Sequence, residues 1–271
     1  MQHIPDVNAA QESLRPNKSD NTPLFSRYSR AYNITNEDLH STLRYARLDG
    51  KSMLTVAASG DHPLFGTMYG ASHIDTFDVT YNAKCIMDIK SAALDTLDYK
   101  TYCAMVMDFH NAPDVTAVNG MSKIFPDLDK IEKQYIYKMR GYGIFGMGVQ
   151  CAEPEKFLPS ESEYEKMRAA PHGPFNFIWS DISDLHTHLT QEYDFMHLSN
   201  IFHYMEPHDC ESVLDNLMPH VAPGGMIMFY DLPFGSMITN CKNRAYAHNK
   251  KWAAEYIPGR PIIVMCRSHI R

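Results

Sequence analysis

The chain has 271 residues and a formal net charge of −7 at pH 7. This length fits one α/β core with an elaboration better than a mini-domain or two equal domains. The negative charge and the lack of any long Lys/Arg run argue against a nucleic-acid partner, whose nonspecific binding is largely electrostatic, and favour a small-molecule substrate.

The sequence also carries expectations about location. No apolar stretch reaches the roughly 18 residues that a membrane helix needs, so we expect no membrane span. The first 20 residues are polar and lack a hydrophobic signal core, which favours a soluble, cytoplasmic protein. Six cysteines are scattered without a CxxC pair, and free thiols are the expected state.

The first 48 residues precede the predicted sheet. Residues 1–22 are rich in Asn, Asp, Gln, Ser and Pro and are predicted to form a flexible tail. Residues 23–48 are predicted to form a helical cover of one or two helices, because Thr35-Asn36-Glu37-Asp38 is typical of a helix N-terminus. Residues 49–271 form the predicted main domain.

Strands and helices alternate in the main domain. Short apolar runs predict buried strands, and apolar residues at helical spacing predict helices. Pro223-Gly224-Gly225 is predicted to be a turn that leads into the last of these strands. The alternation predicts an α/β, Rossmann-like, mostly parallel sheet of about seven strands flanked by helices. The predicted strands are 53–58, 73–79, 175–179, 195–198 and 226–230. A first helix is predicted to begin with Asp61 or His62 as its cap, and two further helices are predicted at 83–97 and 210–220.

Residues 98–172 interrupt this order. Their strand signals are weak, and helical pieces are predicted near 126–139 and 161–170. We interpret the segment as an insertion, which forms either a lid on the substrate side or additional core helices.

The most informative pattern is the turn Ala58-Ser59-Gly60-Asp61 together with Asp78-Val79. In a nucleotide-binding βαβ unit, an acidic residue about 20 positions after the glycine-rich turn accepts hydrogen bonds from ribose hydroxyls. This turn has one glycine where the dinucleotide fingerprint has three. The pattern therefore favours a ligand with ribose but no pyrophosphate, such as S-adenosylmethionine (SAM). The alternative is a glycine that merely ends a strand and an aspartate that caps a helix.

Polar residues also follow two later predicted strands. Asp181-Ile182 and Ser199-Asn200 are expected at the same sheet edge as Asp78, since ligands of parallel sheets bind beyond the carboxyl ends of the strands. Asp181 is a candidate acceptor for an adenine amino group or a helix cap. Ser199 and Asn200 are expected to face the amino acid half of the ligand or the reacting partner.

Aromatic residues and histidines are the remaining candidates. Phe25, Tyr28 and Tyr32 are expected either to cover the ligand, where ring faces attract a sulfonium by about 1 to 2 kcal/mol, or to form a buried helix face. His203 and Tyr204 are either a general base and an orienting group or packing residues. The fourteen histidines show no HExxH or comparable spacing, and we expect no metal.

These residues resemble the class I SAM-dependent methyltransferase fold over roughly residues 50–235. The resemblance rests on the strand and turn up to Asp61, on Asp78 and Asp181, and on the segments 193–200 and 222–226. It implies that Ser59, Gly60 and Asp61 lie beside the amino acid moiety of SAM, Asp78 by the ribose, and Asp181 near adenine.

A closer resemblance is to the diacylglycerol 3-amino-3-carboxypropyltransferases of betaine-lipid synthesis. It rests on 55–61, Phe77-Asp78-Val79 and Lys90-Ser91-Ala92-Ala93, although Thr80-Tyr81 stands where that group has Asn-Pro. The resemblance implies transfer or cyclisation of the 3-amino-3-carboxypropyl arm of SAM, with release of methylthioadenosine. Ser199, Asn200, Tyr28, Tyr32 and Tyr204 are the candidates for holding the nucleophile.

The alternatives are a small-molecule methyltransferase, which releases S-adenosylhomocysteine, and a SAM-binding domain without catalysis. The oligomeric state is open, with a homodimer among the expectations.

Overall fold

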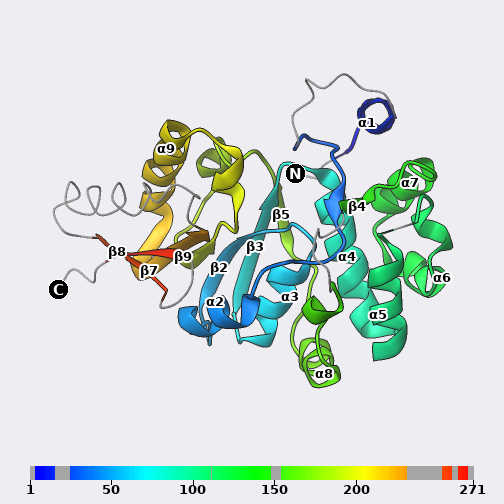
Figure 1. Ribbon diagram of the computed structural model, residues 1–271, viewed down its shortest axis with the longest axis horizontal. Coiled ribbons are helices and arrows are strands. Elements are labelled where there is room, and N and C mark those ends of the chain that lie inside the picture. The colour runs from blue at the N-terminus through cyan, green and yellow to red at the C-terminus, as the bar shows by residue number, and fades with distance from the viewer. Residues whose placement is uncertain are drawn as a thin grey trace.

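A seven-stranded sheet forms the centre of the molecule (Figure 1). The computed structural model describes residues 4–15, 25–110, 112–147, 154–230, 252–257 and 262–267. The order of the strands is β5-β3-β2-β6-β7-β9-β8, and the first five are parallel, whereas β9 is antiparallel to both β7 and β8. The predicted α/β class and the mostly parallel sheet are therefore confirmed. The strands are β2 Ser52–Val56, β3 His73–Asp78, β5 Asn176–Trp179, β6 Tyr193–His197, β7 Val221–Tyr230, β8 Trp252–Tyr256 and β9 Ile262–Arg267.

The sheet is buried on both faces. Neighbouring residues of β2 enter different hydrophobic clusters, since Met53 packs with residues of α3 and α4 and Leu54 packs with residues of α9. Successive side chains of a strand point to opposite faces, so helices cover both sides of the sheet. The helices that follow the strands are α3 Asp61–Met68, α4 Tyr81–Thr96, α9 Pro207–Leu217 and the 3₁₀ turns η4 Leu185–His188, η5 Ile201–Tyr204 and η6 Met218–His220.

The order of the strands reverses at β2. From β2 the chain moves outward through β3 to β5, and it then returns to place β6 on the other side of β2. The connections that follow β2 and β6 therefore diverge, which opens a crevice at the carboxyl ends of these strands. The topology thus places the crevice where the candidate residues of the sequence occur.

Residues 98–172 extend the helical layer on one face. Tyr102, Tyr135 and Tyr164 are buried in the same cluster as the residues of α4. Figure 1 shows α4 to α7 gathered on the side of the sheet away from α9. Of the two alternatives for the insertion, its described residues form additional core helices. The elements are α5 Tyr99–Asp108, η1 Val115–Ala117, α6 Met121–Ile124, η2 Phe125–Asp127, α7 Lys130–Lys138, β4 Phe145–Met147, η3 Pro154–Phe157 and α8 Glu161–Ala169.

The segments before the sheet differ in part from the prediction. Within the predicted tail, Val7–Leu14 forms helix α1, whose Ala10 is buried. The predicted cover contains one helix, α2 (Leu39–Ala46), which begins directly after the predicted start at 35–38 and is capped by Asp38. It also contains a two-residue strand, β1 (Ala31–Tyr32), that pairs with β4. The cover is thus held to the insertion by backbone pairing, which its sequence did not indicate.

Two local predictions need correction. The N-cap of α3 is Gly60, not Asp61 or His62, because the backbone turns there at a φ of 81° and no side chain caps the helix. Pro223-Gly224-Gly225 lies within β7 rather than before it, in the region where the pairing of β7 with β6 shifts register. Among the described helices, none is long and apolar enough to cross a membrane.

Candidate functional site

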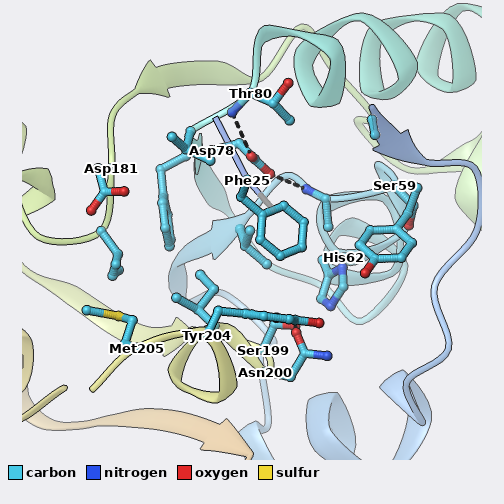
Figure 2. A pocket seen from close by; sticks show the side chains of 18 of the residues that line it. Phe25, Ser59, His62, Asp78, Thr80, Asp181, Ser199, Asn200, Tyr204 and Met205 are labelled. Carbon is cyan, nitrogen blue, oxygen red and sulfur yellow. Dashed lines mark hydrogen bonds between the residues drawn. The ribbon is translucent and has the colours of Figure 1, made fainter. Parts of the chain in front are cut away.

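A cavity of about 570 Å³ lies at the carboxyl ends of β2, β3, β5 and β6 (Figure 2). Its other walls come from η5 and from residues 25–37 of the cover, so segments that are far apart in the sequence enclose it. The described residues of 98–172 do not line it. We refer to this cavity as the switch-point pocket.

Two non-glycine residues of the pocket have left-handed backbone conformations. Ala58, after β2, has a φ of 46°, and Ser199, after β6, has a φ of 57°. This conformation is unfavourable for a residue with a Cβ by about 1–2 kcal/mol, and such strain gathers at functional sites. The two strained turns follow neighbouring strands, which marks this edge of the sheet as a candidate site.

Asp78 ends β3 and lines the pocket. One carboxylate oxygen accepts the N–H of Ala58 at 2.9 Å and the other accepts the N–H of Thr80 at 3.0 Å, as Figure 2 shows. Burial raises the pKa of Asp78 to about 6, although the bonds from the Thr80 and Ala58 N–H groups act in the opposite direction. Each carboxylate oxygen has a second acceptor position, so Asp78 can also accept ligand hydroxyls.

Asp181 and Ile182 line the same pocket after β5, and Val79 also lines it. One oxygen of Asp181 accepts the backbone N–H of Ser183 at 2.9 Å and the hydroxyl of Ser183 at 2.7 Å. These bonds form a local turn with Ser183. The predicted capping role is wrong, because the N-cap of the following 3₁₀ turn η4 is Asp184 and no side chain caps it. The Asp181 carboxylate borders the pocket.

The residues of the turn after β2 are divided between the pocket and the core. Ser59 lines the pocket, whereas Gly60 and Asp61 do not. A Cβ at Gly60 would lie 2.8 Å from the Cα of Met87, so the glycine allows α4 to approach the turn closely.

Asp61 is a structural anchor. Its carboxylate lies 2.5 Å from the ammonium of Lys90, which is fully buried, and burial lowers the pKa of this lysine. The carboxylate also accepts the N–H of Thr35 at 2.8 Å and the hydroxyl of Ser59 at 2.7 Å. Asp61 thereby ties the cover to the turn after β2, a role that the sequence did not indicate.

Some of the aromatic candidates line the pocket and one does not. Phe25, Tyr32 and Tyr204 line the pocket, and the ring of Phe25 meets that of Tyr204 edge-on at 4.7 Å between centroids. Tyr28 is not among the lining residues, because its ring packs against Trp179 and its hydroxyl accepts the N–H of Asp6. The sequence could not separate Tyr28 from Tyr32, which have similar neighbours along the chain.

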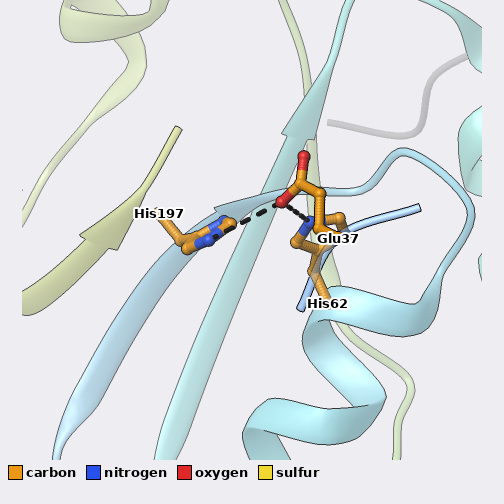
Figure 3. Close-up of side chains that lie close together, drawn as sticks. All are labelled: Glu37, His62 and His197. Carbon is orange, nitrogen blue, oxygen red and sulfur yellow. Dashed lines mark hydrogen bonds and ion pairs between the residues drawn. The ribbon is translucent and has the colours of Figure 1, made fainter. Parts of the chain in front are cut away.

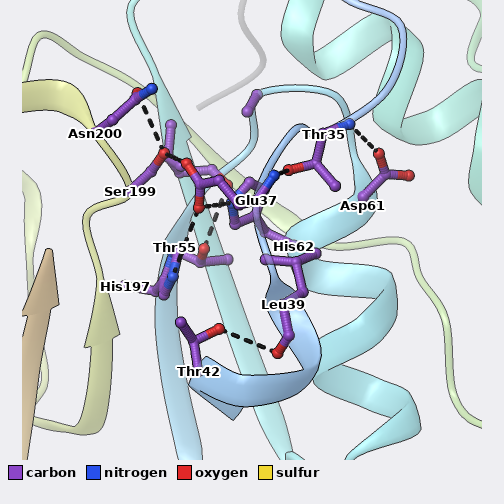
Figure 4. A network of polar contacts seen from close by, with 12 residues as sticks. Thr35, Glu37, Leu39, Thr42, Thr55, Asp61, His62, His197, Ser199 and Asn200 are labelled. Carbon is purple, nitrogen blue, oxygen red and sulfur yellow. Dashed lines mark hydrogen bonds and ion pairs between the residues drawn. The ribbon is translucent and has the colours of Figure 1, made fainter. Parts of the chain in front are cut away.

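A buried polar cluster that the sequence did not indicate lies beside the pocket, and it is made of Glu37, His62 and His197 (Figure 4). The hydroxyl of Ser199 donates to one oxygen of Glu37. The other oxygen lies 3.0 Å from Nε2 of His62 and 3.9 Å from Nε2 of His197. Glu37 and His62 line the pocket together with Ser199 and Asn200.

The charges of this cluster follow from its burial. Burial would raise the pKa of Glu37, but the charge of His62 and the hydrogen bond with it prevail and lower this pKa. Burial, with the nearby charge of His62, lowers the pKa of His197 to about 3, so His197 is neutral at pH 7. The only sequence signal was the helix start at Glu37 and Asp38, which gave no reason to place Glu37 in a site.

The described residues contain one group of His, Cys, Asp and Glu side chains with the geometry of a metal site, and it is this cluster. The ligand atoms of Glu37, His62 and His197 all lie within 4.8 Å of one another. His186 and His188, which are separated by a single residue in the sequence, do not belong to this cluster.

No protein-family model matches the chain, and no curated protein matches it in sequence. Solved structures with similar folds include magnesium protoporphyrin IX methyltransferase from Synechocystis PCC 6803 with bound SAM, at 9% identity and a TM-score of 0.42 over 85% of this chain and 78% of that one. The N-methyltransferase NodS from Bradyrhizobium japonicum WM9, in complex with S-adenosylhomocysteine, has 9% identity and a TM-score of 0.41 over 96% of both chains. A putative methyltransferase from Streptococcus mutans, also with S-adenosylhomocysteine, has 10% identity and a TM-score of 0.40 over 85% of this chain and 96% of that one.

Proposed function

We propose that the chain is an enzyme that binds SAM in the switch-point pocket and transfers one of the groups attached to its sulfonium. The observation that carries this proposal is the position of Asp78. It is a buried carboxylate at the end of β3, it borders the pocket, and it lies beside the single-glycine turn after β2. This is the place where a ribose is held at the switch point of a parallel sheet.

The other walls of the pocket suit the remaining parts of SAM. With the ribose at Asp78, the adenine extends toward Asp181 and Ile182, one strand further out. The methionine arm then extends in the opposite direction, toward Ala58, Ser59, Ser199 and Asn200. The rings of Phe25, Tyr32 and Tyr204 supply faces that attract a sulfonium cation.

For the group that is transferred, we propose the 3-amino-3-carboxypropyl arm, with release of methylthioadenosine. The support is the sequence resemblance around 55–61, Asp78 and Lys90. In such a reaction the pocket must align a nucleophile with the γ-carbon of the methionine chain, mostly by positioning. Ser199, Asn200, Tyr32 and Tyr204 border the pocket and are the proposed positioning groups, whereas Tyr28 is withdrawn from this set because its side chain packs elsewhere.

The test identifies the nucleoside product. The full chain is incubated with SAM, first alone and then with candidate acceptors, and the products are separated by chromatography with mass detection. Methylthioadenosine is expected. Detection of S-adenosylhomocysteine would show that the enzyme transfers the methyl group instead. Tight SAM binding without any turnover would contradict catalysis but agree with the proposed binding site.

The binding site has its own test. Asp78→Ala is expected to reduce SAM affinity at least 100-fold, because it removes the acceptor for the ribose hydroxyls. Asp184→Ala is the matched control, since Asp184 is exposed and lies outside the pocket. Calorimetric titration measures both, and unchanged affinity in Asp78→Ala would reject the proposed position of the ribose.

A further inference from the structure

We propose that Glu37, His62 and His197 form a binding site for a divalent transition-metal ion at the inner end of the switch-point pocket. The three side chains come from separate elements: Glu37 precedes α2, His62 lies in the first turn of α3, and His197 ends β6. Figure 3 shows both imidazoles directed at the same oxygen of Glu37.

The distances fit a metal ion. Zinc binds histidine nitrogen and carboxylate oxygen at about 2.0–2.2 Å, so tetrahedral ligand atoms lie about 3.3 Å apart. The Glu37 oxygen lies 3.0 Å from Nε2 of His62 and 3.9 Å from Nε2 of His197, on either side of this value. Small side-chain rotations would place all three atoms around one ion.

Three histidine nitrogens of the cluster have no hydrogen-bond partner among the described residues. His197 is 1% exposed, and in the described part of the chain neither of its ring nitrogens has a hydrogen-bond partner. Nδ1 of His62 also has none. Buried polar atoms are nearly always paired, so the unpaired His197 beside a carboxylate indicates that a ligand is bound there. A metal ion on Nε2 of His197 supplies that partner.

The surroundings support the carboxylate as a ligand. Ser199 donates to the oxygen of Glu37 that faces away from the histidines, and such second bonds orient a ligating carboxylate. The charge of the carboxylate offsets part of the charge of a divalent ion, and neutral imidazoles are the form that binds metals.

Three protein ligands leave a coordination position open. Glu37 and His62 line the pocket and His197 does not, so the open position faces the pocket. Two histidines with one carboxylate are used by catalytic zinc and by non-haem Fe(II), and both ions bind amine, carboxylate or hydroxyl groups at the open position. The site would thus hold a polar group of whatever molecule fills the pocket. The proposal does not depend on that molecule being SAM.

The experiment measures metal directly and omits SAM. The purified full chain is analysed for zinc and iron by mass spectrometry, with one portion kept anaerobic, and the stripped protein is then titrated with Zn²⁺, Fe²⁺ and Co²⁺. We expect one equivalent per chain and, with Co²⁺, a visible absorption band that Zn²⁺ displaces. The metal retained in the two portions distinguishes zinc from iron.

Three variants locate the ion. His62→Phe and His197→Phe keep a ring of similar size without a donor, and Glu37→Gln removes the charge. Each is expected to weaken binding at least 100-fold, whereas His208→Ala, which changes an exposed histidine, leaves it unchanged. Circular dichroism checks that each variant folds. Should a ligand variant not fold, Ser199→Ala keeps all three ligands and is expected to weaken binding 10- to 100-fold.

Two results would overturn the proposal. One is the absence of stoichiometric binding of any of the three ions by the unaltered chain at micromolar concentrations. The other is unchanged metal affinity in the folded variants. Neither measurement involves SAM, so neither result bears on the proposed SAM site. Conversely, a failure of SAM binding would not contradict the metal site.

Discussion

At the scale of single residues, Asp78 combines burial with two backbone hydrogen bonds. Its pKa is raised to about 6, so the folded protein holds this proton more tightly than the unfolded chain does. The group therefore lowers the stability of the folded protein as the pH rises from the unfolded pKa through 6. A ligand that donates hydroxyl hydrogens to the ionised carboxylate offsets this loss.

The affinity for SAM should depend on pH through this group. Ribose hydroxyls donate best to the ionised carboxylate, so we expect the affinity to fall about tenfold between pH 7 and pH 5, with a midpoint near 6. Calorimetry over this range measures the profile. Asp78→Asn cannot ionise and is expected to bind weakly with a flatter profile; an equally steep profile in this variant would assign the dependence to another group.

At the scale of elements, the turn from β2 into α3 is fixed by its contact with α4. Gly60 has a φ of 81°, and its Cα faces the backbone of Met87. The buried pair of Asp61 and Lys90 joins the same two helices. These contacts hold Ser59 and Ala58 at the pocket, so the turn contributes to the site through its geometry as well as through its side chains.

Gly60→Ala should destabilise the protein by about 3 kcal/mol, from the strained φ and from a contact that forces α4 to move. Gly141→Ala is a matched control, because Gly141 has a φ of 84° but open space where the Cβ would lie. The free energy of unfolding of Gly141→Ala should fall only by the cost of the left-handed backbone conformation, about 1–2 kcal/mol. Urea unfolding compares the two variants, and equal losses would contradict the importance of the contact with α4.

At the scale of the whole molecule, the pocket joins parts of the chain that are far apart. The cover supplies Tyr32 and Glu37, the sheet supplies Asp78, and η5 supplies Tyr204. A ligand in this pocket contacts all three parts at once. Its binding should therefore oppose the separation of the cover from the sheet.

SAM at 100 times its dissociation constant should stabilise the folded chain by about 2.7 kcal/mol. For a protein of this size, that corresponds to a rise in Tm of about 5–10 °C. Thermal melts followed by circular dichroism with and without SAM measure the shift. Asp78→Ala should show a shift of at most about 2 °C and Asp184→Ala the full one. A full shift retained by Asp78→Ala would place SAM elsewhere.

The sequence by itself determined the frame of the site. The strands β2, β3, β5 and β6 were predictable because buried parallel strands are short apolar runs bounded by polar residues. The residues at or just beyond their carboxyl ends, Ala58-Ser59, Asp78, Asp181 and Ser199, were placed at one edge because the carboxyl ends of parallel strands meet there. The pocket has these residues in its walls.

Only the tertiary structure decided which side chains meet. Glu37 contacts His62, 25 positions later, and Ser199, 162 positions later, and local periodicity carries no information about such pairs. The same applies to Asp61, which is bound by Lys90, and to Tyr28, which packs against Trp179 rather than facing the pocket. The cover pairs with β4, and the N–H of Thr35 donates to Asp61. These contacts set the path of the cover across the sheet and bring Glu37 to the two histidines.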